Sequence, residues 1–146
     1  MRNLKLRKYV FKYFELKSIR EQKYRLSERE SEIAKPVLTE LGMIDTLYEW
    51  FKEIALGGKP IPKGNVPQRK KFIFIILYLY SPMTLAGGKM KAGLREKLGN
   101  VLGIKEKTVV SNNINGIVFS YQLYKYFRQD IERIFSEILV RLDKTK

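Results

Sequence analysis

The side chains in this sequence that are best suited to specific binding chemistry lie close together after residue 107. The ones that can both donate and accept hydrogen bonds are Thr108, Ser111, Asn112 and Asn115. Their spacing puts them on one side of a helix that begins near residue 107, because a helical turn takes 3.6 residues. Side chains of this kind contact the edges of base pairs, and asparagine suits adenine. Together these four residues are the recognition face, which we predict to contact DNA bases.

Cations gather next to the recognition face, at Lys89, Lys91, Arg95, Lys97, Lys105 and Lys107. The chain has a net charge of +14, of which residues 1–30 contribute +6 and residues 69–107 contribute +7. Evenly spread lysines would serve solubility alone. A basic block beside a polar helix face instead predicts a polyanionic partner, whose phosphates these side chains would contact.

A glycine corner is expected to position these groups. Leu94, Leu98 and Leu102 recur every four residues and predict the buried face of a helix over residues 89–102. Gly103 supplies the positive φ for a sharp turn, and Ile104 fills the corner. The buried stripe of the next helix is expected to be Val110, Ile114, Ile117 and Tyr121. A purely structural corner in an all-helical protein would show the same pattern, and this is the alternative.

Residues 89–122 resemble the helix-turn-helix superfamily, which includes winged-helix and phage repressor proteins. The resemblance implies that the second helix lies in the major groove of DNA. The sequence departs from the family pattern in a turn that is one residue longer, in Asn113 at an aliphatic position and in Gly116 within the recognition helix. The segment from Tyr78 to Gly88, followed by the corner and an aromatic-rich helix, is similar to small proteins of phages and mobile elements.

The last element is expected to be one long helix from about residue 107 to residue 142, interrupted at most near Gly116. Alternating steps of four and three residues separate Ile117, Tyr121, Tyr124, Arg128, Ile131, Phe135, Ile138 and Leu142. Such a seam is typical of an oligomerisation helix, and we predict a homo-oligomer through it. A helix in the core of its own domain would give the same pattern. Core packing is also the favoured explanation for the aromatic stretch from Phe119 to Phe127.

The N-terminal part is expected to contain a basic segment and two helices. Residues 3–16 fit both strand alternation and a helical stripe, and we favour a helix because no second strand is available for pairing. Ser27 and Glu30 form a capping box. The helix that it starts is expected to kink at Pro36, stop at Gly42 and bury Ile33, Val37, Leu38 and Leu41. Asp45 caps the next helix, which ends at Gly57-Gly58 and buries Leu47, Tyr48, Trp50, Phe51 and Ile54.

The glycine- and proline-rich segment 57–68 predicts a loop. After it, Gln68 to Tyr80 predicts an apolar helix whose first turn carries Arg69, Lys70 and Lys71; these cations either extend the basic patch or solvate the helix end. The expected organisation is therefore 1–56, 57–68 and 69–146, packed as one compact all-α domain with a C-terminal helix-turn-helix leading into a long final helix.

Composition excludes several classes of function. The chain has no cysteine and no histidine, which excludes disulfides and removes the commonest general base and zinc ligand. Glu28, Glu30 and Glu32, like the pair Glu49 and Glu53, lack a companion aspartate motif for magnesium. We expect no enzymatic activity, no cofactor and no metal. The longest apolar run, Phe72 to Tyr80, is shorter than the roughly 20 residues of a spanning helix. With no signal peptide, we expect no membrane partner and a location in the host cytoplasm or a virion.

These patterns predict a non-catalytic protein that binds double-stranded DNA, as a regulator or as a DNA-packaging or assembly factor of a phage or mobile element. The alternative is a structural or adaptor protein, such as a virion component, whose basic face binds nucleic acid or an acidic partner nonspecifically. Dependence of binding on the DNA sequence separates the two hypotheses.

Overall fold

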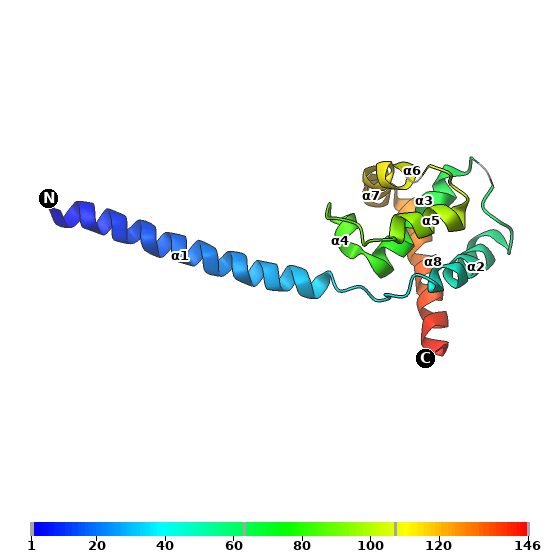
Figure 1. Ribbon diagram of the computed structural model, residues 1–146, viewed down its shortest axis with the longest axis horizontal. Helices are drawn as coiled ribbons and strands as arrows, with labels where there is room; N and C mark the ends of the chain where they lie inside the picture. Colours follow the sequence, from blue (N-terminus) through cyan, green and yellow to red (C-terminus); the bar gives the residue numbers. More distant parts are fainter. Residues whose placement is uncertain (1, 63, 107, 146) are drawn as a thin grey trace. The chain divides into compact units, whose positions relative to one another are not determined.

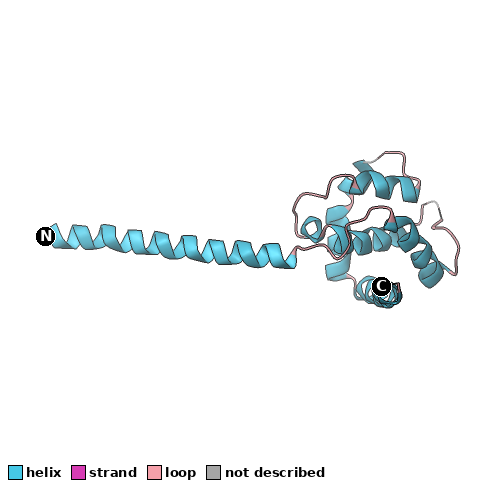
Figure 2. Ribbon diagram, turned by 60° about the horizontal axis from the view of Figure 1, so that its bottom comes forward, coloured by secondary structure: helices cyan, strands magenta, loops and turns pink. Residues whose placement is uncertain are grey.

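The computed structural model describes residues 2–62, 64–106 and 108–145, with side chains from residue 5 onward. The regular structure in these ranges is helical, without strands, which confirms the all-α class (Figures 1 and 2). The chain divides after Lys35 into two units, residues 1–35 and 36–146. The division does not fall at the loop 57–68, which lies inside the second unit.

The first unit contains helix α1 (Arg2–Ile33), which is followed by Ala34 and Lys35. Residues 3–16 are helical, as favoured from the sequence. The helix start predicted at Ser27 is wrong, because Ser27 and Glu30 lie inside α1. A capping box marks a start only where the preceding residues are not helical, and here no glycine or proline interrupts the preceding backbone. Every side chain described in α1 is exposed to solvent.

The helix predicted to extend to Gly42 is also wrong, since α1 ends at Ile33. Proline disfavours the helical conformation of the residue before it, so Pro36 acts as a terminator rather than a kink. The second unit, residues 36–146, is the compact unit. Its first residues are held by backbone hydrogen bonds, because the N–H groups of Val37 and Leu38 donate to the Leu79 carbonyl at 2.9 and 3.0 Å. Leu38 packs against the core, whereas Val37 stays exposed.

The compact unit is built around α3 (Val66–Tyr80), which contacts most other helices of the unit. Its buried side chains span more than half of its circumference because it lies between these neighbours: Phe72, Ile73, Ile75, Ile76, Leu77, Leu79 and Tyr80. The predicted apolar helix is thus confirmed. It begins two residues earlier than predicted, because the Asn65 Oδ1 accepts a hydrogen bond from the Gln68 N–H at 3.3 Å and Pro67 fits the first turn.

On one side of α3 lies α2 (Met43–Leu56), whose buried side chains are Ile44, Leu47 and Phe51. The expected burial of Leu47 and Phe51 is confirmed, as is the end at Gly57, where φ is +62°. Asp45 lies in the first turn rather than at the cap, so the predicted cap is wrong by three positions. Tyr48, Trp50 and Ile54 are partly buried against the core.

The second half of the compact unit contains α4 (Pro82–Leu85), α5 (Leu94–Leu102), α6 (Thr108–Asn112), α7 (Ile114–Leu123) and α8 (Lys125–Lys144). The helix predicted over 89–102 therefore starts only at Leu94. The prediction of one long final helix is also wrong, because three helices take its place. Asn113 interrupts it once, as its Nδ2 donates to the Val109 carbonyl at 2.7 Å, and Tyr124 breaks it again with an extended backbone at φ −100° and ψ 105°.

The seam expected along the final helix lies largely within the domain. Its members Ile117, Ile131, Ile138 and Leu142 belong to the hydrophobic core, together with Ile134. Tyr124, where the helix breaks, is exposed. The side chains that predicted an oligomer thus pack inside their own unit, and core packing explains their spacing.

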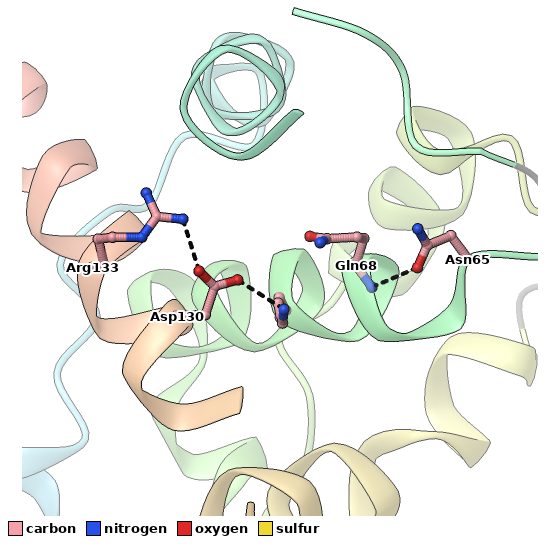
Figure 3. A network of polar contacts seen from close by, with 5 residues as sticks. Asn65, Gln68, Asp130 and Arg133 are labelled. Carbon is pink, nitrogen blue, oxygen red and sulfur yellow. Dashed lines mark hydrogen bonds and ion pairs between the residues drawn. The ribbon is translucent and has the colours of Figure 1, made fainter. Parts of the chain in front are cut away.

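An ionic cluster joins α3 to α8 (Figure 3). Asp130 accepts hydrogen bonds from the Lys71 Nζ at 2.8 Å and from the Arg133 Nη2 at 2.7 Å. Burial raises the pKa of the Asp130 carboxyl, but these hydrogen bonds and the two positive charges outweigh it, so the pKa lies below its usual range. The charge of Lys71 is therefore paired with Asp130 of α8.

Candidate nucleic-acid interface

The predicted glycine corner is present between α5 and α6. Gly103 ends α5 with φ +70°, and the Ile104 N–H donates to the Gly99 carbonyl at 2.8 Å. Leu94 and Leu98 are fully buried, and Ile104 packs against the core. The expected inward positions beyond the corner are also confirmed, since Val110, Ile114, Ile117 and Tyr121 are buried or partly buried against the core.

A tight strap precedes α5 and places its cations. The Ser81 hydroxyl accepts a hydrogen bond from the Lys91 N–H at 3.1 Å, and the Gly88 N–H donates to the Met83 carbonyl at 2.7 Å. A Cβ on Gly88 would lie 2.9 Å from that carbonyl oxygen, so only glycine fits there. Lys89 and Lys91 therefore lie on this irregular strap, and their predicted place on the first helix is wrong.

The strap, α5 and α6 enclose a hollow of about 390 Å³. Its charged and hydroxyl-bearing lining residues are Thr84, Lys89, Lys91, Arg95 and Ser111, and the remaining ones are glycine or apolar. Among the residues that the structure describes, no carboxylate lines it. The Arg95 Nη1 donates to the Ser111 Oγ at 3.4 Å, which links α5 to α6 across the hollow. Four residues predicted to bind DNA thus converge on a site with the charge and donors that a phosphate needs.

The recognition face is open to solvent. Thr108, Asn112 and Asn115 are exposed, and Ser111 is partly buried. The break at Asn113 divides this face, because Asn115 lies at the start of α7 whereas the other three belong to α6. Other helices of the compact unit therefore do not cover this face. A purely structural corner is also compatible with an uncovered face, but it does not require one.

The predicted cations differ in their surroundings, including Lys91, which also lines the first hollow. Lys105 is exposed and, with Arg69, lines a second hollow of about 780 Å³ on the other side of the corner. Lys97 pairs with Asp45 of α2 at 2.5 Å, so its charge is neutralised away from the recognition face. Lys91 donates from its Nζ to the Thr39 carbonyl at 2.7 Å and lies over the Tyr80 ring. Lys107 lies outside the described residues.

An exposed aromatic surface at the junction of α7 and α8 was not predicted. It comprises Phe119, Leu123, Tyr124 and Tyr126, of which Tyr126 is 85% exposed. The Phe119 and Tyr124 rings meet edge to face at 6.4 Å. The sequence favoured core packing for the stretch from Phe119 to Phe127, and of its rings Tyr121 and Phe127 pack against the core as expected. The other rings of the stretch are exposed, and helical periodicity does not reveal the break at Tyr124.

No other chemistry emerges from the described residues. No group of three histidines, cysteines, aspartates or glutamates in the ranges 2–62, 64–106 and 108–145 could hold a metal ion. Within the same ranges, no helix is both long and apolar enough to cross a bilayer. Comparison with protein-family models, curated proteins and solved structures finds no match for this chain.

Proposed function

We propose that residues 36–146 form a non-catalytic domain that binds double-stranded DNA at the corner of α5 and α6. The observation that carries the proposal is the convergence of Lys89, Lys91, Arg95 and Ser111 on one hollow. Asn112, which is exposed, follows Ser111 along α6. Phosphate contacts position a protein on DNA and base contacts specify the site. The arrangement supplies candidates for both.

In this proposal the corner works as a helix-turn-helix. Helix α5 is the supporting helix, and α6 with the first turn of α7 enters the major groove. Thr108, Asn112 and Asn115 contact base edges, while Lys89, Arg95 and Lys105 contact phosphates. The biological role implied by the sequence resemblance is that of a regulator or a packaging or assembly factor of a phage or mobile element.

Selection on random duplex DNA tests the proposal, followed by affinity measurements on the preferred site. We expect Asn112→Ala and Asn115→Ala each to cost about 1–3 kcal/mol at that site and to relax the preference at one or two base pairs. Binding of all sequences with equal affinity by the parent protein and both variants would contradict base recognition by this face.

The phosphate contacts have their own test. Lys105→Ala should weaken binding to every sequence alike and lower the slope of log affinity against log salt by about one unit. Lys144→Ala is the matched control, because it removes the same charge from the far end of α8, distant from α6 (Figure 1). Equal effects of the two variants would show that binding follows net charge and not the corner.

A second candidate function is supported by the aromatic surface of Phe119, Leu123, Tyr124 and Tyr126. Exposed rings of this density are typical of contacts between proteins. A structural or adaptor protein would bind its partner there and use its basic face without sequence preference. The selection experiment separates the two functions, since an adaptor yields no enriched DNA site.

A further inference from the structure

The first half of α1 has an apolar face that is exposed to solvent. At 100° per residue, its six side chains lie within an arc of about 160°. They are Leu6, Tyr9, Val10, Tyr13, Phe14 and Leu16, and each is between 43% and 68% exposed. A helix that presents such a face in water has an unfilled binding surface.

The rest of the same segment's surface is basic apart from Phe11 and Glu15, which lie on the side opposite the apolar face. Lys5, Arg7, Lys8 and Lys12 are exposed, and no acidic residue precedes Glu15. Cations at a helix N-terminus oppose the macrodipole, and Lys8 and Lys12 are like charges one turn apart. Helix stability therefore does not account for these cations, whereas an anionic partner does.

A second copy of the chain fits this face poorly. Beyond Leu16 the same side of α1 carries Arg20, Ser27 and Ser31, with Tyr24 as its remaining ring. The apolar stripe thus ends well short of the three to four heptads that sustain a coiled coil. Pairing two stripes in parallel would also bring the two basic segments together. DNA would neutralise the cations but leave the six apolar side chains in water.

The surface of an anionic lipid bilayer would contact both the apolar side chains and the cations of this segment. Interfacial helices bury a face of aromatic and aliphatic residues at the boundary of the acyl chains and hold lysine and arginine among the headgroups. Tyrosine suits this boundary, because its ring is apolar and its hydroxyl reaches water. A helix that lies in the interface needs no spanning length, so the absence of a spanning helix among the described residues is compatible with it.

We propose that residues 5–16 of α1 bind an anionic lipid surface and lie in its plane. Leu6, Tyr13 and Phe14 face the acyl chains, and Lys8 and Lys12 reach the headgroups. The proposal goes beyond DNA binding and does not depend on it, since the corner of α5 and α6 belongs to the other unit.

Co-sedimentation of the full chain with vesicles of equimolar phosphatidylglycerol and phosphatidylcholine tests the proposal. Phe14→Gln should lower partitioning by about tenfold or more, the loss expected when one buried ring is removed. Leu26→Gln is the control: Leu26 is 70% exposed, lies beyond residues 5–16 and projects from the side of α1 opposite the apolar face. Its loss should change partitioning by less than about twofold. Equal losses in both variants, or no binding by the parent, would overturn the proposal.

The cations give a second measurement. Lys8→Gln and Lys12→Gln should each weaken binding by about fivefold, and vesicles of phosphatidylcholine alone should bind weakly. Lys144→Gln, in the compact unit, controls for net charge. Light scattering addresses the second copy: a parent dimer that Phe14→Gln converts to a monomer would overturn the proposal. Duplex DNA binding measured on Phe14→Gln should match the parent, so failure here is distinguishable from failure of the proposed function.

Discussion

The two units of this protein differ in which residues control the path of their backbone. Residues 1–35 contain neither glycine nor proline, and residues 2–33 of them form one helix, whereas residues 36–146 hold all ten glycines and all five prolines of the chain. In α1 only backbone hydrogen bonds and local preferences fix the conformation. In the compact unit, turning residues bring distant segments together, and burial then stabilises them.

Two segments with similar composition have opposite surroundings in the two units. Residues 5–16 and α3 both combine a basic cluster with aromatic and aliphatic side chains. In α3 the apolar run is unbroken after Lys71, and all of its side chains are buried except Phe74, which is partly buried, and Tyr78, which is exposed. In α1, Lys12 and Glu15 interrupt the run, so burial on all sides would leave charges unpaired. Composition therefore does not decide between core and surface, whereas the position of the charges does.

The largest effect that can test this comparison is the loss of a ring from each segment. Phe72 is fully buried, with its ring centroid 5.0 Å from that of Tyr48 and 5.3 Å from that of Phe51. Phe72→Ala should destabilise the compact unit by about 3–5 kcal/mol in urea unfolding, because it loses burial and leaves a cavity. Phe14→Ala should change the same transition by less than about 0.5 kcal/mol. A comparable loss for both would mean that α1 contributes to the core.

A smaller effect separates the ion pairs of the two units. Asp130→Asn should cost on the order of 1–3 kcal/mol, because Lys71 and Arg133 lose a partly buried partner. Glu32→Gln breaks the Arg29–Glu32 pair of α1, whose side chains are 70% and 67% exposed, and should cost at most about 0.5 kcal/mol.

The pH dependence gives an independent check on Asp130. Its pKa in the folded protein lies below the unfolded value of about 3.9. The carboxylate therefore stabilises the fold above about pH 5, and this contribution is lost as the pH falls through the folded pKa. Asp130→Asn should therefore make the stability less dependent on pH in this acidic range. An unchanged pH dependence of the free energy of unfolding in Asp130→Asn would assign the acid sensitivity to other carboxylates.

The parts of the fold predicted correctly from the sequence are those that depend on local periodicity. Leu94, Leu98, Val110 and Ile117 are buried where helical spacing placed them, and Gly103 has the left-handed backbone that the corner requires. Such positions repeat every three or four residues, and a glycine after the last one marks the end of a helix.

Features that depend on distant partners could not be predicted this way. Lys91 meets Thr39, and Lys97 meets Asp45, each across 52 residues of sequence. Six cations looked equivalent in the sequence, and these contacts distinguish them. The heptad-like spacing likewise encodes neither the break at Tyr124 nor the packing of α8 against α2 and α3.

Substitution of two glycines of the compact unit should change stability in opposite directions. Gly103 has φ +70° with open space around its missing side chain, so Gly103→Ala should cost about 1–2 kcal/mol through backbone strain alone. Gly116 lies inside α7 with negative φ, and a Cβ there would meet the Lys70 Nζ at an ordinary 3.7 Å. Gly116→Ala should therefore stabilise the unit by about 0.5–1 kcal/mol through helix propensity.

Thermal unfolding of both variants measures the two shifts. Destabilisation by both would mean that α7 needs flexibility at Gly116, and neutrality at Gly103 would mean that the corner can relax to a negative φ. In α1, which has no glycine, no position offers a comparable test, because its conformation does not depend on a turn.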